Sequence, residues 1–227
     1  MRPEPLGPEA PLHGEGGAAF KFLDFFTEAD RELFEGRDDA VEAVLAGALR
    51  SRTFVLYGAS GSGKTSLLLA GVFPELRDRG YRPVYVRVLE DPETDLTRAL
   101  LETWSSDEAP PDDLHELLVK LSGEAPLVVA LDQFEEFFVR FEEESERRAA
   151  FIVLLGRLLA DRQVDLRVIF SLRQEWLGEL DDFREVLPGL LDFEYRLRSL
   201  TAFGARQAIS RQLNAAPADP IASSLRA

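Results

Sequence analysis

The segment 58–65, with the letters GASGSGKT, constrains the fold of this chain more than any other. It follows an apolar stretch at 53–57, which we expect to be a strand, and it precedes a helical pattern over 65–79. Glycines in such a loop let the backbone curl so that successive N–H groups point at one anion, and the following helix directs its positive end there. The pattern predicts a phosphate-binding loop made of Gly58, Ala59, Ser60, Gly61, Ser62, Gly63, Lys64 and Thr65.

Three side chains at the end of this loop have specific expected roles. Lys64 should bridge the β and γ phosphates of a nucleotide, and the Thr65 hydroxyl should bind Mg²⁺. Ser66 is a candidate helper near the α phosphate. The alternative is a glycine-rich turn with an exposed lysine, but eight constrained positions between a strand and a helix favour phosphate binding.

A second apolar stretch, 127–131, runs into Asp132, which is the pattern of a Walker B strand. The carboxyl ends of parallel strands are where α/β proteins bind ligands, so we expect Asp132 beside the phosphate loop. Its role there is to hold Mg²⁺ through water, because Mg²⁺ keeps several of its waters. Glu135 and Glu136 follow, and either could orient and polarise an attacking water.

Two arginines are further candidates. Arg173 follows the apolar stretch 166–171, and it would face the γ phosphate if that strand lies between the strands ending at Gly58 and Asp132. A guanidinium in that place distinguishes ATP from ADP through charge-assisted hydrogen bonds. The alternative is a surface arginine that merely follows a strand. Gly36 and Arg37 precede the loop by about twenty residues and could form a turn that lines the adenine pocket; a simple helix-start turn is the alternative.

Strand and helix patterns alternate along the chain, which indicates a parallel sheet covered by helices on both faces. Further strands are expected at 83–88 and, as a half-exposed edge strand, at 193–197. Helices are expected at 38–49, 94–104, 112–121, 147–160 and 202–213. The predicted organisation is a flexible arm (1–19), an N-terminal helical segment (20–50), the nucleotide-binding core (51–200) and the start of a helical lid (201–227).

Composition limits the partners. The formal net charge of −15 argues against nucleic acid, because phosphate backbones require clustered cations. No signal peptide and no membrane-spanning run is present in the sequence, so we expect a cytoplasmic protein without a membrane partner. The guanine-reading sequence Asn-Lys-x-Asp is also absent.

Taken together, these segments resemble the STAND class of P-loop NTPases, and most closely the bacterial group called novel STAND NTPase 1. The likeness is carried by 21–37, by 58–76, by the block DQFEEFF at 132–138, and by FSLR at 170–173. It implies a three-layer fold of the additional-strand type, with five parallel strands ordered 5-1-4-3-2. It also implies ATP rather than GTP, Mg²⁺, and catalytic roles for Glu135, Glu136 and Arg173.

The resemblance further implies a regulatory switch in which ATP is hydrolysed slowly and the ATP state assembles into a homo-oligomer. The chain ends at Ala227, within what the family plan makes a helical lid. Effector and sensor domains are therefore expected in the same protein or in a partner chain. Two alternative functions are a module that retains nucleotide without significant turnover and, less favoured, a small-molecule kinase.

Overall fold

The structure is a computed structural model that describes residues 25–34 and 36–199. The predicted arm 1–19, the predicted helix 202–213 and the predicted lid start 201–227 lie outside the described residues. The division of the chain at residues 19, 50 and 200 stays a prediction.

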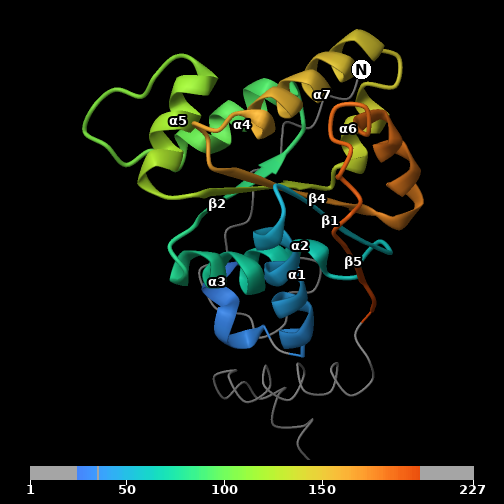
Figure 1. Ribbon diagram of the computed structural model, residues 1–227. Coiled ribbons are helices and arrows are strands. Elements are labelled where there is room, and N and C mark those ends of the chain that lie inside the picture. Colours follow the sequence, from blue (N-terminus) through green and yellow to red (C-terminus); the bar gives the residue numbers. More distant parts are fainter. Residues whose placement is uncertain (1–24, 35, 200–227) are drawn as a thin grey trace, which may run out of the picture.

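Five parallel strands form one sheet in the order β2-β3-β4-β1-β5 (Figure 1). The strands are β1 Thr53–Gly58, β2 Arg82–Arg87, β3 Leu127–Asp132, β4 Leu166–Arg173 and β5 Glu194–Leu197. This is the predicted order 5-1-4-3-2 read from the opposite edge, so the predicted topology is confirmed. β5 is a half-exposed edge strand, as its alternating sequence predicted.

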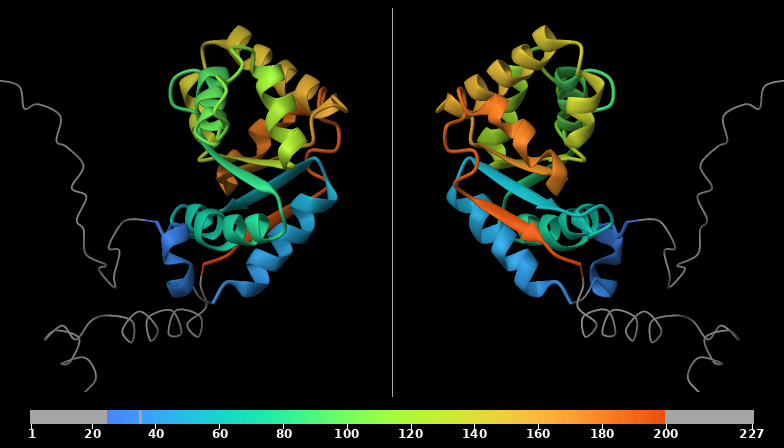
Figure 2. Two further views of the ribbon diagram at one scale, coloured as in Figure 1. Left: turned by 90° about the vertical axis from the view of Figure 1, so that its left-hand side faces the viewer. Right: turned by 90° about the vertical axis from the view of Figure 1, so that its right-hand side faces the viewer.

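Separate sets of helices cover the two faces of the sheet (Figures 1 and 2). One face carries α4 Pro92–Leu101, α5 Leu114–Glu124, α6 Glu135–Arg140 and α7 Ser145–Ala160, and the other carries α1 Asp38–Arg50 and the helix after the loop. Alternate residues of β3 enter the two cores: Val129 and Leu131 one, Val128 and Ala130 the other. Because β3 is buried on both faces, it is apolar throughout. The three-layer α/β fold is confirmed.

The register brings the carboxyl ends of the central strands together. Gly58 pairs with Arg173, and Asp132 pairs with Arg87. β4 lies between β1 and β3, which is the arrangement that the expected position of Arg173 requires. The phosphate loop, Asp132 and Arg173 therefore lie together at the carboxyl ends of the strands.

The helix after the loop is continuous but not uniform. It begins as α2 Lys64–Ser66, continues as the π-helical segment η2 Leu67–Val72 and ends as α3 Phe73–Asp78. Pro74 has no N–H, and its ring would clash with the carbonyl of Ala70 in a regular α-helix. The chain widens instead, and the Phe73 N–H donates to the carbonyl of Leu68, five residues back.

Other helices differ from expectation at their ends. α4 and α5 begin at Pro92 and Leu114 because Asp91 and Asp113 cap them, accepting hydrogen bonds from the N–H groups three residues on. Two 3₁₀ segments, η1 Glu28–Leu33 and η3 Gln174–Phe183, were not expected from periodicity. Within 25–34 and 36–199, no helix combines the length and apolar character that crossing a membrane requires.

Gly71 lets the N-terminal segment approach the helix after the loop. A Cβ on Gly71 would lie 2.6 Å from Val41 Cγ2 and 3.0 Å from Phe34 Cε1. Val41 belongs to α1, and Phe34 comes shortly before the Gly36–Arg37 turn. The missing side chain at Gly71 therefore sets how closely that turn can sit to the phosphate loop.

We predict that Gly71→Ala lowers the free energy of unfolding by about 1–3 kcal/mol, because the added methyl overpacks the Val41 contact. Chemical denaturation measures the change. Gly123→Ala in α5 is the matched control, since a Cβ there meets no atom within 4 Å. The control should be neutral or stabilising by up to about 1 kcal/mol. Equal stability of the two variants would contradict this account of Gly71.

Candidate nucleotide-binding site

The phosphate loop has the backbone geometry that its glycines predict. Gly61 and Gly63 have φ of +70° and +91°, in the left-handed region that favours glycine. Gly58 is required for a different reason, because a Cβ there would lie 2.4 Å from the carbonyl oxygen of Leu197 in β5. Ala59 and Ser60 lie exposed at the tip of the loop.

Lys64 points its ammonium back at the loop. Its side chain is buried, and Nζ donates to the carbonyl oxygens of Gly58 and Ala59, each at 3.3 Å. Burial lowers the pKa of the Lys64 ammonium, and the charges of Glu135 and Asp132 oppose that shift. Among the described residues, no carboxylate lies within ion-pair distance of Nζ. The cation is thus held in the loop by neutral carbonyl groups.

The loop also contains a buried donor without a partner. The Ser62 hydroxyl is buried and makes no hydrogen bond to any described residue. Buried hydroxyls in folded proteins are nearly always hydrogen-bonded, so an unpaired one indicates a missing partner. Together with Lys64 and the N-terminus of the following helix, this donor fits a phosphate group.

Asp132 lies next to this loop, and its carboxylate is held by three hydroxyl groups. It is 1% exposed. Oδ2 accepts from Thr65 Oγ1 at 2.6 Å and from the Tyr85 hydroxyl at 3.0 Å, and Oδ1 accepts from Ser171 Oγ at 2.5 Å. Burial, and after it the charge of Asp132, raise the pKa of Tyr85, so its phenol stays a donor. Thr65 and Asp132, the two expected Mg²⁺ ligands, are therefore in direct contact.

Glu135 and Arg173 form an ion pair at the ends of α6 and β4. Arg173 Nε lies 3.0 Å from Glu135 Oε1, and the Arg173 N–H donates to Oε2 at 3.2 Å. Glu135 is 7% exposed, whereas the Arg173 side chain is about half exposed. The structure thus brings these two candidates together, and the charges of both act on Lys64.

Glu136 points to a different partner. Arg87 Nη2 donates to Glu136 Oε1 at 2.7 Å and to Gln133 Oε1 at 2.6 Å. Gln133 has φ of +51°, an uncommon conformation for a residue with a side chain, in the turn that follows Asp132. Arg87 at the end of β2 therefore holds the turn before Glu135 through hydrogen bonds to Gln133 and Glu136.

The turn before α1 also contacts the loop. Arg37 Nη2 donates to the Ser62 carbonyl at 2.8 Å, and Nη1 donates to the Arg198 carbonyl at 2.6 Å. Gly36 has φ of +76°, which explains a glycine before α1. Ser66 Oγ accepts from the Phe26 N–H at 3.1 Å. Arg37 thus contacts the loop, and the Ser66 hydroxyl anchors the N-terminal segment. The adenine-side role of Gly36 and Arg37 and the α-phosphate role of Ser66 stay predictions.

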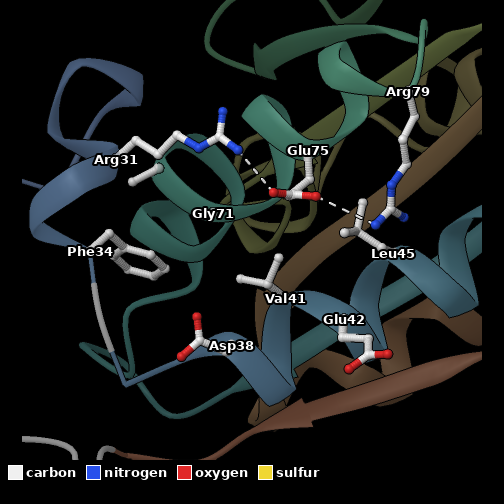
Figure 3. Close-up of a pocket in the computed structure, with 10 residues that line it drawn as sticks. Arg31, Phe34, Asp38, Val41, Glu42, Leu45, Gly71, Glu75 and Arg79 are labelled. Atoms are coloured by element: carbon white, nitrogen blue, oxygen red, sulfur yellow. Dashed lines mark hydrogen bonds and ion pairs between the residues drawn. The ribbon is translucent and has the colours of Figure 1, made fainter.

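A separate cavity of about 340 Å³ lies between η1, α1, η2 and α3 (Figure 3). Glu75 stands at its rim between Arg31 and Arg79, which approach its two carboxylate oxygens to 2.9 and 3.4 Å. Arg31 also pairs with Asp78 at 2.9 Å. The two ion pairs of Arg31 tie η1 to α3, so this cavity belongs to the packing of the N-terminal segment on the helix after the loop.

Sequence reasoning assigned no role to Tyr85, Arg87 or Ser171, although all three contact predicted site residues. The strand period carries a signal for them. Residues two apart on a strand share a face, so Tyr85 shares one with Arg87, and Ser171 shares the face of Ile169 and, across the sheet, of Ala130. The signal becomes usable only once the strand order is known.

Comparison with known proteins agrees with this geometry. The sequence matches the family described as Novel STAND NTPase 1 over residues 20–219. The chain belongs to this family. No curated protein matches the chain.

Solved structures share the fold of this STAND domain. The ORC2 protein of Aeropyrum pernix, in ADPNP–ADP complexes, is 19% identical with a TM-score of 0.59, and the match covers 86% of this chain and 55% of that one. A Walker-type ATPase of Pyrococcus abyssi is 15% identical with a TM-score of 0.61, covering 92% and 67%. The A. pernix ORC1 protein in complex with DNA is 20% identical with a TM-score of 0.56, covering 82% and 52%.

At these identities the likeness concerns the fold alone. The chain spans about half the length of the ORC proteins it matches. It carries the P-loop NTPase fold, and its activity and partners are matters for proposal.

We predict that Ser171→Ala lowers the free energy of unfolding by about 1–3 kcal/mol, because a buried carboxylate loses one of its donors. Chemical denaturation measures the loss. Ser122→Ala is the matched control: Ser122 is also buried, but its hydroxyl donates only to the Val119 carbonyl of its own helix, at 3.3 Å. The control should change stability by less than about 1 kcal/mol. Similar losses in both variants would show that the contact with Asp132 carries no particular weight.

Proposed function

We propose that this domain binds ATP with Mg²⁺ and hydrolyses it slowly, as the nucleotide switch of a STAND-type signalling or defence ATPase. One observation carries the proposal: the buried ammonium of Lys64 and the contact between Thr65 and Asp132 meet at the same curled loop. Cation, anion-binding backbone and metal-binding oxygens are the parts that a magnesium–triphosphate complex requires.

Phosphate recognition in this proposal uses groups that the protein itself does not satisfy. Lys64 makes only two long hydrogen bonds to carbonyl groups, and the Ser62 hydroxyl makes none to the described residues. A phosphate would place an opposite charge beside the Lys64 ammonium and give the Ser62 hydroxyl an ionised acceptor, and a hydrogen bond to an ionised acceptor is roughly twice as strong as a neutral one.

The metal site in this proposal consists of Thr65 and Asp132. A hydroxyl has one proton and two lone pairs, so Thr65 can donate to Asp132 and still present oxygen to a cation. One hydroxyl and one carboxylate suit Mg²⁺, which retains several waters. When bound, Mg²⁺ neutralises charge on the β and γ phosphate oxygens.

Glu135 is the better candidate for orienting water. Its charge acts on Lys64, and it lies nearly buried at the start of α6. Glu136 instead pairs with Arg87 at the end of β2. Both carboxylate oxygens of Glu135 contact Arg173, which restrains the proposed base and supports slow turnover.

Arg173 is the proposed sensor of the γ phosphate. Its guanidinium is about half exposed and held by one carboxylate, so it can exchange Glu135 for a phosphate without losing its charge partner. A difference in affinity between two conformations is what a nucleotide needs to shift a switch. Self-assembly in the ATP state, effector and sensor domains in the same or a partner chain, and the absence of a nucleic-acid partner in this acidic domain are parts of the same proposal.

Lys64→Ala tests the binding of ATP. We expect the affinity for ATP to fall by about 10- to 100-fold, because a charge-assisted contact worth about 1.5–3 kcal/mol is lost. Isothermal titration calorimetry measures the affinity, and circular dichroism checks that the fold is retained. Lys120→Ala in α5, where the ammonium lies over Trp104, is the control and should bind as the wild type does. Unchanged affinity in Lys64→Ala would refute the phosphate role.

Glu135→Gln and Glu136→Gln test the hydrolytic step. Glu135→Gln should keep ATP affinity and lower the single-turnover hydrolysis rate by about 10²–10⁴-fold, the usual contribution of a positioned base. Glu136→Gln should lower the rate less than about tenfold and cost at most about 1 kcal/mol of stability, since its pair with Arg87 is partly exposed. A larger rate loss in Glu136→Gln would reverse the assignment. Absence of hydrolysis in wild type would favour the nucleotide-retaining module.

A further inference from the structure

Tyr85 reaches the expected metal site from a strand that is separated from β1, the strand before the phosphate loop, by β3 and β4. It belongs to β2, which within residues 25–34 and 36–199 pairs with β3 alone and lies at the sheet edge opposite β5. Its hydroxyl donates to Asp132 Oδ2 at 3.0 Å, the same oxygen that accepts from Thr65. The ring packs against the core between the sheet and the helix after the loop.

The register explains how this contact arises. Tyr85 pairs with Ala130, and Arg87 pairs with Asp132. Ala130 and Asp132 share a face of β3 because side chains alternate along a strand. A tyrosine beside Ala130 is long enough to reach diagonally to the residue two positions on. A small side chain at residue 130 leaves room for the ring, and Asp132 at the strand end receives its hydroxyl.

The three hydroxyls restrict the orientation of the Asp132 carboxylate by binding both of its oxygens. Ser171 holds Oδ1, while Thr65 and Tyr85 share Oδ2. An ionised carboxylate only accepts hydrogen bonds, so each of the three hydroxyls donates its hydrogen bond to Asp132. Thr65 is itself an expected metal ligand, which leaves Tyr85 and Ser171 as the groups that orient the carboxylate without binding the metal.

We propose that Tyr85 is a positioning residue that sets the Mg²⁺ affinity of the nucleotide site by orienting the Asp132 carboxylate beside Thr65. The inference rests on the proposed function and extends it to β2. Partners that hydrogen-bond to metal ligands typically change metal affinity by about 10- to 100-fold when they are removed. Tyr85 therefore acts on the metal and leaves the metal-free contact between the loop and the phosphates unaffected.

Tyr85→Phe removes the hydroxyl and keeps the ring that packs in the core. The affinity for ATP is measured by calorimetry in EDTA and at a series of Mg²⁺ concentrations. In EDTA, ATP affinity should stay within about twofold of wild type, while the Mg²⁺ concentration for half-maximal tightening should rise by about tenfold or more. A loss of equal size with and without Mg²⁺ would mean that Tyr85 only supports the fold, and it would overturn the proposal.

Tyr57→Phe is the matched control. Tyr57 is also a strand tyrosine whose hydroxyl donates to a carboxylate, that of Glu194, at 3.3 Å. It packs on the opposite face of the sheet, away from Asp132. Its Mg²⁺ dependence should match that of wild type, and a shift as large as that of Tyr85→Phe would overturn the proposal.

A double variant shows whether Tyr85 acts through Asp132. If it does, Tyr85→Phe should add no further shift in Mg²⁺ dependence when Asp132→Asn is already present, because interacting residues are non-additive. If Tyr85→Phe added its full shift in the presence of Asp132→Asn, the inference would be overturned, whereas the proposed binding of ATP would still stand. Wild-type ATP affinity that ignores Mg²⁺ would instead overturn the metal part of the proposed function, and this inference with it.

Discussion

The arrangement of the site depends on one buried carboxylate. Removing the charge of Asp132 from water costs several kcal/mol unless hydrogen bonds replace the lost hydration. Here the replacements come from Thr65 in α2, Tyr85 in β2 and Ser171 in β4. All three hydroxyls reach one side chain because β3 lies between β2 and β4 and because the helix after the loop packs on the sheet. The strand order and the solvation of Asp132 are therefore a single constraint.

A cluster of phenylalanines packs beneath the segments that carry the catalytic candidates Glu135 and Arg173. Phe134 lies between Asp132 and Glu135 in the chain, and its ring centroid lies 5.0 Å from Phe137, 5.1 Å from Phe170 and 5.7 Å from Phe183. These rings join α6 to β4 and to η3, the segment that follows Arg173. In the block DQFEEFF the phenylalanines thus build the core, and the acids between them are presented at the strand ends. Glu135 and Arg173 meet because the elements that carry them share this core.

Neighbouring acids in this block have different surroundings. Glu135 faces Arg173 and the charge of Lys64, whereas Glu136 faces Arg87. The left-handed backbone at Gln133 and the hydrogen bond from Arg87 to Gln133 direct the two side chains apart. Spacing along the chain left both acids as candidates, because consecutive helix residues differ by about 100° in direction and the absolute orientation of a short helix is set by what it packs against. The tertiary contacts separate them.

Neighbouring residues alone specify the local chemistry of this protein: the curled loop around Lys64, the apolar strand that ends at Asp132, and the alternation of strands and helices. Such features depend on backbone conformation and on burial pattern, which neighbouring residues specify. Contacts between distant parts of the chain, by contrast, bring Tyr85, Arg87 and Ser171 into the site and pair Arg173 with Glu135. Those contacts join residues 38 to 49 positions apart, and their geometry follows from strand order and register, which result from packing the whole sheet.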